Sequence, residues 1–292
     1  MTSGSLPPIA SGPASSTPAF TLSNGDRVPQ VGLGTHLIKD PGEIDVAIKA
    51  AVRCGYRMID TATVYRNEES IGTTLQDILA RPETYHVTRA DLFIVSKLAP
   101  RDQGYDACDR AVRASLARLQ LDYIDLYLIH WPGTQKLPSD SDRNPINRLG
   151  SWRALEALKA TGLVRHIGVS NYTMDHLRDL LSAAVVAPSV LQIEYHPLYQ
   201  PTALLLDLCQ AHGIQLQAYS SLGQGRFLEG GSVPLPLLTA LADRYQVPAS
   251  AILLRWGIQH GAVVIPKSRD PQRIRDNIRC LDFELDIEAS YP

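Results

Sequence analysis

Four polar side chains in the first half of the chain have the types that acid–base chemistry requires. They are a carboxylate, a phenol, an amine and an imidazole, at Asp60, Tyr65, Lys97 and His130. An ammonium beside a phenol favours the phenolate, so we expect Lys97 to lower the pKa of Tyr65 from its usual value of about 10. A neutral imidazole can donate a hydrogen bond to an oxygen that gains negative charge. Brought together, the four groups suit proton delivery to a carbonyl that is being reduced.

Each of these residues also has an ordinary structural explanation. Asp60 and Lys97 can form a structural ion pair, Tyr65 can be a loop tyrosine, and His130 can be a hydrogen-bonded core histidine. The chemical interpretation depends on the combination, because a carboxylate and an ammonium are costly to bury unless they are paired. The elements that carry the four side chains decide whether they meet.

Short apolar segments alternate with segments of helical periodicity from Val31 onward. The apolar segments are continuous runs, as in strands that are buried on both faces of a parallel sheet. They are Val31–Thr35, Met58–Ala62, Leu92–Leu98, Ile124–Trp131, Val164–Ser170, Leu191–His196, Gln215–Ser221 and Val263–Ser268. The helical segments are Glu43–Cys54, Glu68–Leu79, Tyr105–Leu119, Trp152–Lys159, Asp175–Leu181, Thr202–Ala211, Leu235–Tyr245 and Gln272–Arg279. This alternation predicts an α/β fold, a (β/α)8 TIM barrel.

An open, doubly wound sheet is the competing architecture. It would show G-x-G-x-x-G after an early strand, whereas Gly32-Leu33-Gly34 continues as Thr35-His36-Leu37 without the third glycine. We therefore favour the barrel, in which functional side chains lie at the C-terminal ends of the strands. Neighbouring strands are about 4.8 Å apart, so Asp60 and Lys97 are expected to meet.

The domain organisation is predicted to be simple. Residues 1–19 consist almost entirely of Ser, Pro, Ala, Gly and Thr, and we expect them to form a disordered leader. Residues 20–292 are expected to form a single barrel domain that carries the catalysis. At its start, Asn24-Gly25 lies between two β-prone segments and predicts an N-terminal β-hairpin.

The composition of the 292 residues excludes several classes of function. The 28 basic and 30 acidic residues give a formal charge of −2, which argues against nucleic acid as a partner. No uncharged apolar run approaches ~18 residues, so no membrane partner is expected. The four cysteines lie far apart without metal-ligand spacing, which predicts free thiols and no metal. We expect a cytoplasmic monomer that acts on a small molecule.

The end of the last predicted strand has the pattern of an anion site. Lys267 and Ser268 precede Asp270-Pro271, where Asp can cap a helix and Pro can occupy its first turn. Barrels often bind phosphate with this loop and a helix N-terminus. Lys267 together with Arg273 suits the 2′-phosphate of NADPH better than NADH, whose ribose usually meets an acid. A solvated basic face on an outer helix is the alternative.

Three ordered motifs resemble those of the aldo-keto reductase family. The first runs from Gly55-Tyr56-Arg57-Met58-Ile59-Asp60-Thr61-Ala62 through Tyr65 and Asn67-Glu68 to Ile71-Gly72. The second runs from Leu121 to Pro132, and the third is Ile265-Pro266-Lys267-Ser268 followed by Arg273 and Asn277. The resemblance implies an NADPH-dependent oxidoreductase that reduces aldehydes or ketones to alcohols. It also implies that Tyr65 is the general acid, that Asp60 and Lys97 tune it, and that His130 orients the carbonyl.

The resemblance further implies where cofactor and substrate bind. Ser170, Asn171 and Gln192 would hold the nicotinamide carboxamide, and Tyr219 would stack on its ring. The implied NADPH-binding residues are Ser170, Asn171, Gln192, Tyr219, Ser220, Leu222, Lys267, Ser268, Arg273 and Asn277. His36 and Trp131 are candidates for the substrate pocket, although His36 is equally well explained as a surface-loop histidine. Family members commonly continue past the final helix into a lid over the active site, whereas this sequence stops at Pro292. The resemblance therefore implies an active site that is open to solvent and favours small carbonyls or dicarbonyls.

Two other functions compete with this interpretation. The first is a cofactor-binding regulatory or auxiliary relative with little turnover, which the presence of all four candidate residues disfavours. The second is a lyase or aldolase that uses Lys97 as a Schiff base. Consumption of NADPH with an aromatic aldehyde would exclude the first, and borohydride trapping of substrate would reveal the second.

Overall fold

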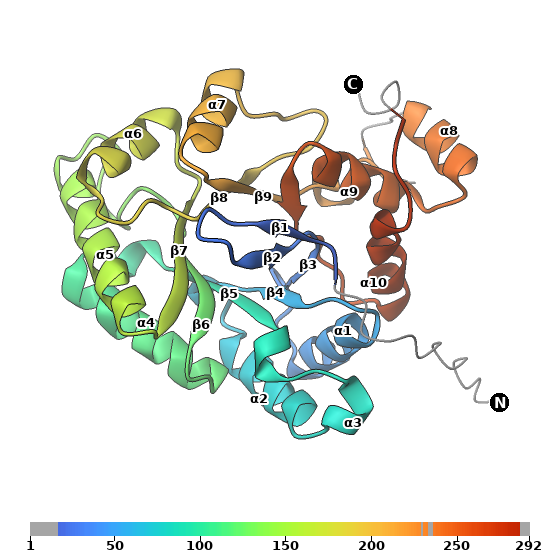
Figure 1. The fold of residues 1–292 in the computed structure, drawn as a ribbon, viewed down its shortest axis with the longest axis horizontal. Helices are drawn as coiled ribbons and strands as arrows, with labels where there is room; N and C mark the ends of the chain where they lie inside the picture. Colours follow the sequence, from blue (N-terminus) through green and yellow to red (C-terminus); the bar gives the residue numbers. More distant parts are fainter. Residues whose placement is uncertain (1–16, 229, 233–235, 287–292) are drawn as a thin grey trace.

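The computed structural model describes residues 17–228, 230–232 and 236–286 (Figure 1). Residues 1–16 of the predicted leader and residues 287–292 lie outside the described residues. Eight strands form one sheet in the order β3-β4-β5-β6-β7-β8-β9-β10, and every neighbouring pair is parallel. Helices lie between the strands in sequence and surround them in space. The predicted barrel is therefore confirmed.

The strands lie close to the predicted apolar runs. They are β3 (Gly32–Gly34), β4 (Met58–Asp60), β5 (Phe93–Leu98), β6 (Ile124–Ile129), β7 (Val164–Ser170), β8 (Val190–Glu194), β9 (Gln215–Tyr219) and β10 (Ala262–Val264). Parallel bridges join Val31 to Val264 and Gly34 to Lys267, so the first and last strands of the sheet also meet. Gly34 is required at this seam, because a Cβ there would lie 2.8 Å from the carbonyl oxygen of Ile265.

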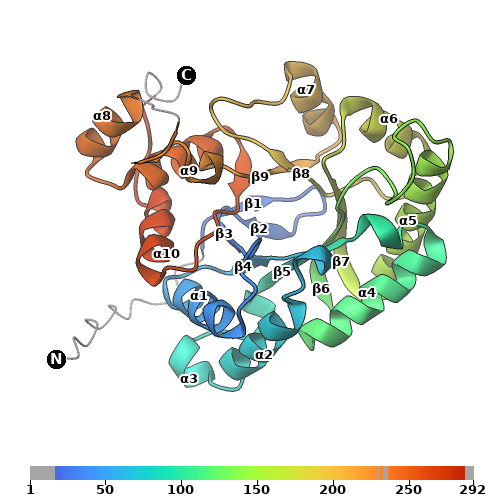
Figure 2. The same ribbon diagram turned by 180° about the vertical axis from the view of Figure 1, so that it is seen from behind.

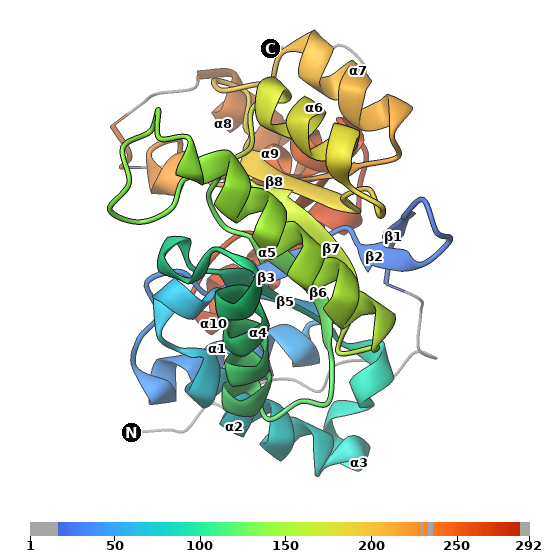
Figure 3. The ribbon, with the colours of Figure 1, turned by 90° about the vertical axis from the view of Figure 1, so that its left-hand side faces the viewer.

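An antiparallel hairpin covers the N-terminal end of the barrel. It consists of β1 (Ala19–Thr21) and β2 (Arg27–Pro29), with Phe20 opposite Val28 and Gly25 at φ +88° in the turn. Val28 packs with Met58 and Phe93 in the cluster of apolar side chains inside the barrel. Figure 3 shows the hairpin at one end and the loop before α5 at the other. The predicted hairpin is confirmed, and it leaves the C-terminal rim of the strands to the functional loops.

The helices pack their apolar faces against the outside of the strands. They are α1 (Pro41–Arg53), α2 (Glu68–Leu79), α3 (Pro82–Tyr85), α4 (Tyr105–Leu119), α5 (Arg143–Ala160), α6 (Met174–Ala183), α7 (Ala203–Ala211), α8 (Pro236–Tyr245), α9 (Ala249–Gln259) and α10 (Pro271–Ile278). Helix α9 was not predicted, because residues 251–258 are all buried and show no polar face. Helix α5 begins nine residues before the predicted Trp152, since its first half carries few apolar residues. None of the described helices combines the length and apolarity needed to cross a membrane.

Candidate active site

Asp60 and Lys97 form a buried ion pair at the C-terminal rim, the side of the barrel that faces the viewer in Figure 2. Asp60 ends β4 and Lys97 lies on the adjacent β5, with exposed fractions of 2% and 0%. The Lys97 Nζ is 2.5 Å from Asp60 Oδ1 and donates to the carbonyl oxygen of Thr61 at 2.8 Å. Burial alone lowers the pKa of Lys97, but Asp60 and Tyr65 more than offset it, so the pKa is raised. Lys97 is therefore an ammonium, and its predicted meeting with Asp60 is confirmed.

Tyr65 lies beside this pair on a short 3-10 helix, Thr63–Tyr65, that follows β4. The Lys97 Nζ is 5.2 Å from the centroid of the Tyr65 ring. Asn67 fixes the segment, because its amide accepts from the Thr61 hydroxyl at 2.7 Å and donates to the Thr35 carbonyl at 3.0 Å. Sequence reasoning gave Asn67 no such role, since the loop contact with Thr35 is visible only in three dimensions.

The pKa of Tyr65 differs from the prediction. Burial raises it above the ordinary value, and the opposing effect of Lys97 offsets this only in part. Asp60 also raises the pKa of Tyr65, because a carboxylate disfavours a second negative charge nearby. Lys97 therefore acts in the predicted direction, but the predicted net lowering of the Tyr65 pKa is wrong, because burial outweighs the effect of Lys97. Tyr65 carries its proton at neutral pH, which is the state that a proton donor needs.

His130 follows β6 and forms the other side of the Tyr65 environment. The two rings meet edge to face with centroids 5.8 Å apart, and His130 is 8% exposed. Burial, with a contribution from Lys97, lowers the pKa of His130 to about 3. Its Nδ1 is buried without a partner among the described residues, so Nε2 is the nitrogen open to a ligand. The neutral imidazole that the sequence predicted is thus present.

The predicted nicotinamide residues lie at the same rim and are hydrogen-bonded to one another. Asn171, at φ +62° after β7, donates to the His130 carbonyl at 2.9 Å and to the Ser170 hydroxyl at 3.1 Å. Tyr219, at the end of β9, donates its hydroxyl to the Asn171 amide oxygen at 2.8 Å. These contacts hold the Asn171 amide in one orientation.

Gln192 on β8 extends the ion pair toward these residues. Its Nε2 donates to Asp60 Oδ2 at 2.8 Å and to the amide oxygen of Gln217 at 3.0 Å. Both amide hydrogens are thereby engaged, and the Gln192 oxygen remains to accept from a ligand. This free acceptor, together with the hydroxyl hydrogen of Ser170, fits the donor and acceptor of a carboxamide. Gln217, which is 1% exposed, was missed although a polar residue inside an apolar strand is a visible signal.

The predicted phosphate residues precede α10 or lie on it: Lys267 and Ser268 come before its cap, Arg273 is in its first turn, and Asn277 is near its end. Lys267 and Arg273 are exposed, whereas Ser268 and Asn277 are 8% and 4% exposed. The predicted cap is confirmed, because the Asp270 carboxylate accepts from the backbone N–H groups of Gln272 and Arg273. The expectation that the N-terminus of this helix binds a phosphate is wrong in part, because Asp270 already accepts hydrogen bonds from these two N–H groups. The side chains of Lys267 and Arg273 then carry the attraction for an anion.

Two charged side chains around α10 have partners of their own. Arg269 pairs with Glu43 at 2.9 Å, and Asp276 accepts from Gln272 at 3.0 Å. Ser220, at φ +52°, and Leu222 follow β9 at the same rim. The Arg269–Glu43 pair also acts on Lys267, because burial and Arg269 lower the pKa of Lys267 while Glu43 raises it.

The predicted substrate residues flank Tyr65 and His130. The His36 ring is 4.9 Å from the Tyr65 ring, and Trp131 is 48% exposed with its ring stacked 6.4 Å from His130. The structure therefore places His36 against the candidate proton donor. Leu37 and Val64, which are 64% and 40% exposed, add apolar surface in the loops that carry these residues and were not predicted.

Metal and disulfide chemistry find no support in the described part of the chain. It holds no group of three or more His, Cys, Asp or Glu side chains that fits a metal ion. Cys54, Cys108, Cys209 and Cys280 are free thiols, and burial raises the pKa of Cys209 to about 11.

Comparisons with known proteins identify the family of the chain. The family model of the aldo/keto reductase family matches residues 30–290. The chain is 41% identical over 276 residues to glyoxal reductase of Bacillus subtilis (strain 168), covering 94% of this chain and 91% of that protein. It is 40% identical over 281 residues to aldo-keto reductase family 1 member A1 of Sus scrofa, covering 91% and 85%. A Bombyx mori aldo-keto reductase in complex with NADP has a TM-score of 0.83 at 35% identity, covering 94% and 91%.

The fold and the rim of polar side chains define the class of TIM-barrel oxidoreductases. Within that class, the chain belongs to the aldo/keto reductase family. The family uses nicotinamide cofactors, and small carbonyl compounds are its general substrate type.

Proposed function

We propose that this protein reduces small aldehydes, ketones or dicarbonyls to alcohols with NADPH. The observation that carries the proposal is the buried Lys97–Asp60 pair beside a protonated Tyr65 and a neutral His130. The preference for dicarbonyls is supported by the similarity to a glyoxal reductase. The exposed imidazole of His36 beside Tyr65 adds a hydrogen-bonding group for a second oxygen.

The proposed chemistry places the carbonyl oxygen between Tyr65 and His130. His130 donates a hydrogen bond from Nε2 as negative charge builds on that oxygen. Tyr65 then gives its hydroxyl proton to the oxygen. Lys97 stabilises the phenolate that remains, and Asp60 keeps Lys97 charged and in place. The nicotinamide cofactor, when bound, supplies the hydride.

The cofactor is proposed to bind along the rim. Ser170, Asn171 and Gln192 would hold the carboxamide, and the Tyr219 ring would support the nicotinamide. Ser220 and Leu222 would follow the cofactor from the loop after β9. Lys267, Ser268, Arg273 and Asn277 would bind the 2′-phosphate and the adenosine end. The choice of cofactor is supported by a Bombyx mori relative of the same fold whose structure is a complex with NADP.

The Schiff-base alternative is disfavoured by the state of Lys97. A Schiff base requires a neutral amine, whereas the pKa of Lys97 is raised and its side chain is fully buried. We extend the proposal to residues 20–292 as one catalytic domain that acts as a cytoplasmic monomer.

The decisive experiment is a panel of carbonyl compounds assayed with NADPH and with NADH. We expect turnover of glyoxal, methylglyoxal and an aromatic aldehyde, with NADPH preferred. The matched control is Tyr65→Phe, which keeps the ring and removes the donor. Absence of NADPH oxidation across the panel, in protein that binds NADPH, would support the auxiliary relative instead.

A further inference from the structure

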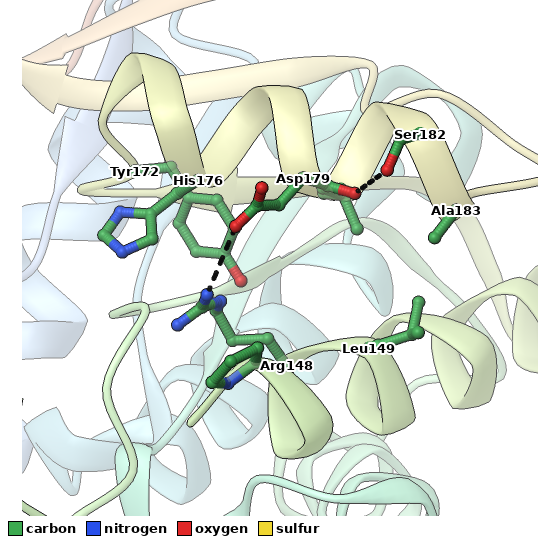
Figure 4. Close-up of a pocket in the computed structure, with 9 residues that line it drawn as sticks. Arg148, Leu149, Tyr172, His176, Asp179, Ser182 and Ala183 are labelled. Carbon is green, nitrogen blue, oxygen red and sulfur yellow. Dashed lines mark hydrogen bonds and ion pairs between the residues drawn. The ribbon is translucent and has the colours of Figure 1, made fainter. Parts of the chain in front are cut away.

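A cavity outside the proposed active site lies between α5 and α6 (Figure 4). Its volume is about 220 Å³, and its apolar wall consists of Pro145, Leu149, Leu180 and Ala183. Since a water molecule takes about 30 Å³ in the liquid, the cavity has room for roughly seven waters or for one small substituted ring. We refer to it as the α5–α6 cavity.

The polar wall of the α5–α6 cavity contains an unpaired buried hydroxyl. Tyr172 is 2% exposed, and its hydroxyl has no hydrogen-bond partner among the described residues. Figure 4 shows the Tyr172 ring directed toward the guanidinium of Arg148. A buried hydroxyl without a partner is unfavourable, so this donor is available to a ligand that brings an acceptor.

Arg148 places a positive charge next to that hydroxyl. Its side chain is 11% exposed and donates one hydrogen bond, to the Pro132 carbonyl at 3.3 Å. Asp179 is 3.9 Å away with a side chain that is 70% exposed, so it neutralises Arg148 only weakly. The guanidinium therefore has N–H groups left for an anion.

His176 supplies a third donor. Its Nδ1 accepts from the backbone N–H of Thr173 at 3.3 Å, which leaves the proton of a neutral ring on Nε2. Burial, with a contribution from Arg148, lowers the pKa of His176, so the ring is neutral at neutral pH. Three donors and an apolar wall then line one small cavity.

We propose that the α5–α6 cavity binds a small monocarboxylate with an apolar ring or short chain. The carboxylate would accept from Arg148 and Tyr172, with His176 as a further donor, and the apolar part would pack on Leu149 and Leu180. The carboxylate of Asp179 disfavours ligands with a second negative charge.

The α5–α6 cavity adjoins the back of the proposed active site without sharing its side chains. Tyr172 directly follows Asn171, and the guanidinium of Arg148 bonds to Pro132, two residues after His130. The proposal concerns binding alone, so it can fail or succeed independently of carbonyl reduction.

The test is a titration of the full chain with sodium benzoate. Binding is measured by calorimetry and by the NMR chemical shifts of α6. We expect saturable binding that weakens about tenfold or more in Tyr172→Phe and in Arg148→Met, because each loses a hydrogen bond to a charged group. Arg178→Met is the matched control, since this arginine lies on α6, the other helix beside the cavity, outside the residues that line it, and its side chain is 58% exposed. It should bind benzoate like the unmodified protein, and benzyl alcohol should not bind.

A crystal grown with benzoate should show the carboxylate within hydrogen-bond distance of the Tyr172 hydroxyl. The proposal is wrong if Tyr172→Phe binds benzoate as tightly as the unmodified protein, or if benzoate occupies the Tyr65 site alone. Tyr172→Phe retains the ring and loses an unpaired group, so it decides the question even if Arg148→Met does not fold.

Discussion

Replacing Lys97 with methionine leaves the carboxylate of Asp60 buried without its cation. The two side chains are 0% and 3% exposed and 2.5 Å apart. Removing one partner of a buried pair costs about 3–5 kcal/mol. The hydrogen bond from Gln192 to Asp60 Oδ2 persists. We therefore expect Lys97→Met to lower the free energy of unfolding by about 3 kcal/mol, the lower end of that range.

The double variant separates charge burial from packing. Asp60→Asn combined with Lys97→Met removes both charges, so most of the lost stability should return, with a coupling energy of about 2–3 kcal/mol. Arg113→Met is the control, because it breaks a pair with Asp109 in which the arginine side chain is 56% exposed. That variant should unfold much like the unmodified protein.

Urea unfolding, followed through the fluorescence of the buried Trp152, measures these differences. The slope against urea should stay constant, so the midpoints report stability. A double variant as unstable as the sum of the two single variants would show that the side chains are not electrostatically coupled. Lys97→Met should also lose carbonyl reduction by orders of magnitude, because nothing then stabilises the phenolate of Tyr65.

Four further predictions follow from the site and the cavity. Tyr65→Phe should lower kcat about 10²–10⁴-fold while NADPH still binds in a fluorescence titration, and near-normal turnover would exclude Tyr65 as the acid. Lys267→Ala or Arg273→Ala should weaken NADPH binding about tenfold or more and leave NADH binding unchanged, and equal losses would contradict 2′-phosphate recognition. Because the pKa of His130 is lowered from 6.5 to about 3, the unfolded chain binds more protons between these values. The free energy of unfolding should therefore fall by up to about 1.4 kcal/mol for each unit that the pH drops in that window. In an acid-unfolding experiment, His130→Gln should lose less free energy of unfolding per pH unit than the unmodified protein. Tyr172→Phe should raise the thermal midpoint slightly, since an unpaired buried hydroxyl costs about 1–3 kcal/mol, and a clear drop would mean that the hydroxyl has a partner.

The sequence predicted the architecture because most of the strands are uninterrupted apolar runs. In a barrel, parallel strands end at one rim, so the residues at the ends of such runs converge. The sequence alone therefore predicts that Asp60, Lys97 and His130 share a site. Helix α9 was not predicted, because residues 251–258 are all buried and lack the alternation of apolar and polar faces that reveals a helix.

Contacts that depend on how loops and helix ends fold in three dimensions were harder to predict. The pattern of Asp270-Pro271 indicated a cap, but not that the cap would occupy the N–H groups offered to a phosphate. The contact of His36 with Tyr65 depends on how a loop folds over the rim, and the sequence left it undecided. The orientation of Asn171 by Tyr219 joins two strand ends that are far apart in the chain.

The pKa of Tyr65 shows what the ion pair contributes to the proposed reaction. Lys97 lowers this pKa and Asp60 raises it, so Asp60 cannot act by making the phenol more acidic. Its contribution is to keep Lys97 charged at a position where burial alone would favour the neutral amine. Before proton transfer, Asp60 largely neutralises the ammonium, and the phenol keeps its proton. Once the proton leaves, a negative charge appears on the Tyr65 phenol, whose ring centroid is 5.2 Å from that ammonium, and the attraction between the two charges exists only from that point onward. The pair therefore stabilises the product of proton transfer more than the bound substrate, which is the condition for an interaction to accelerate a reaction.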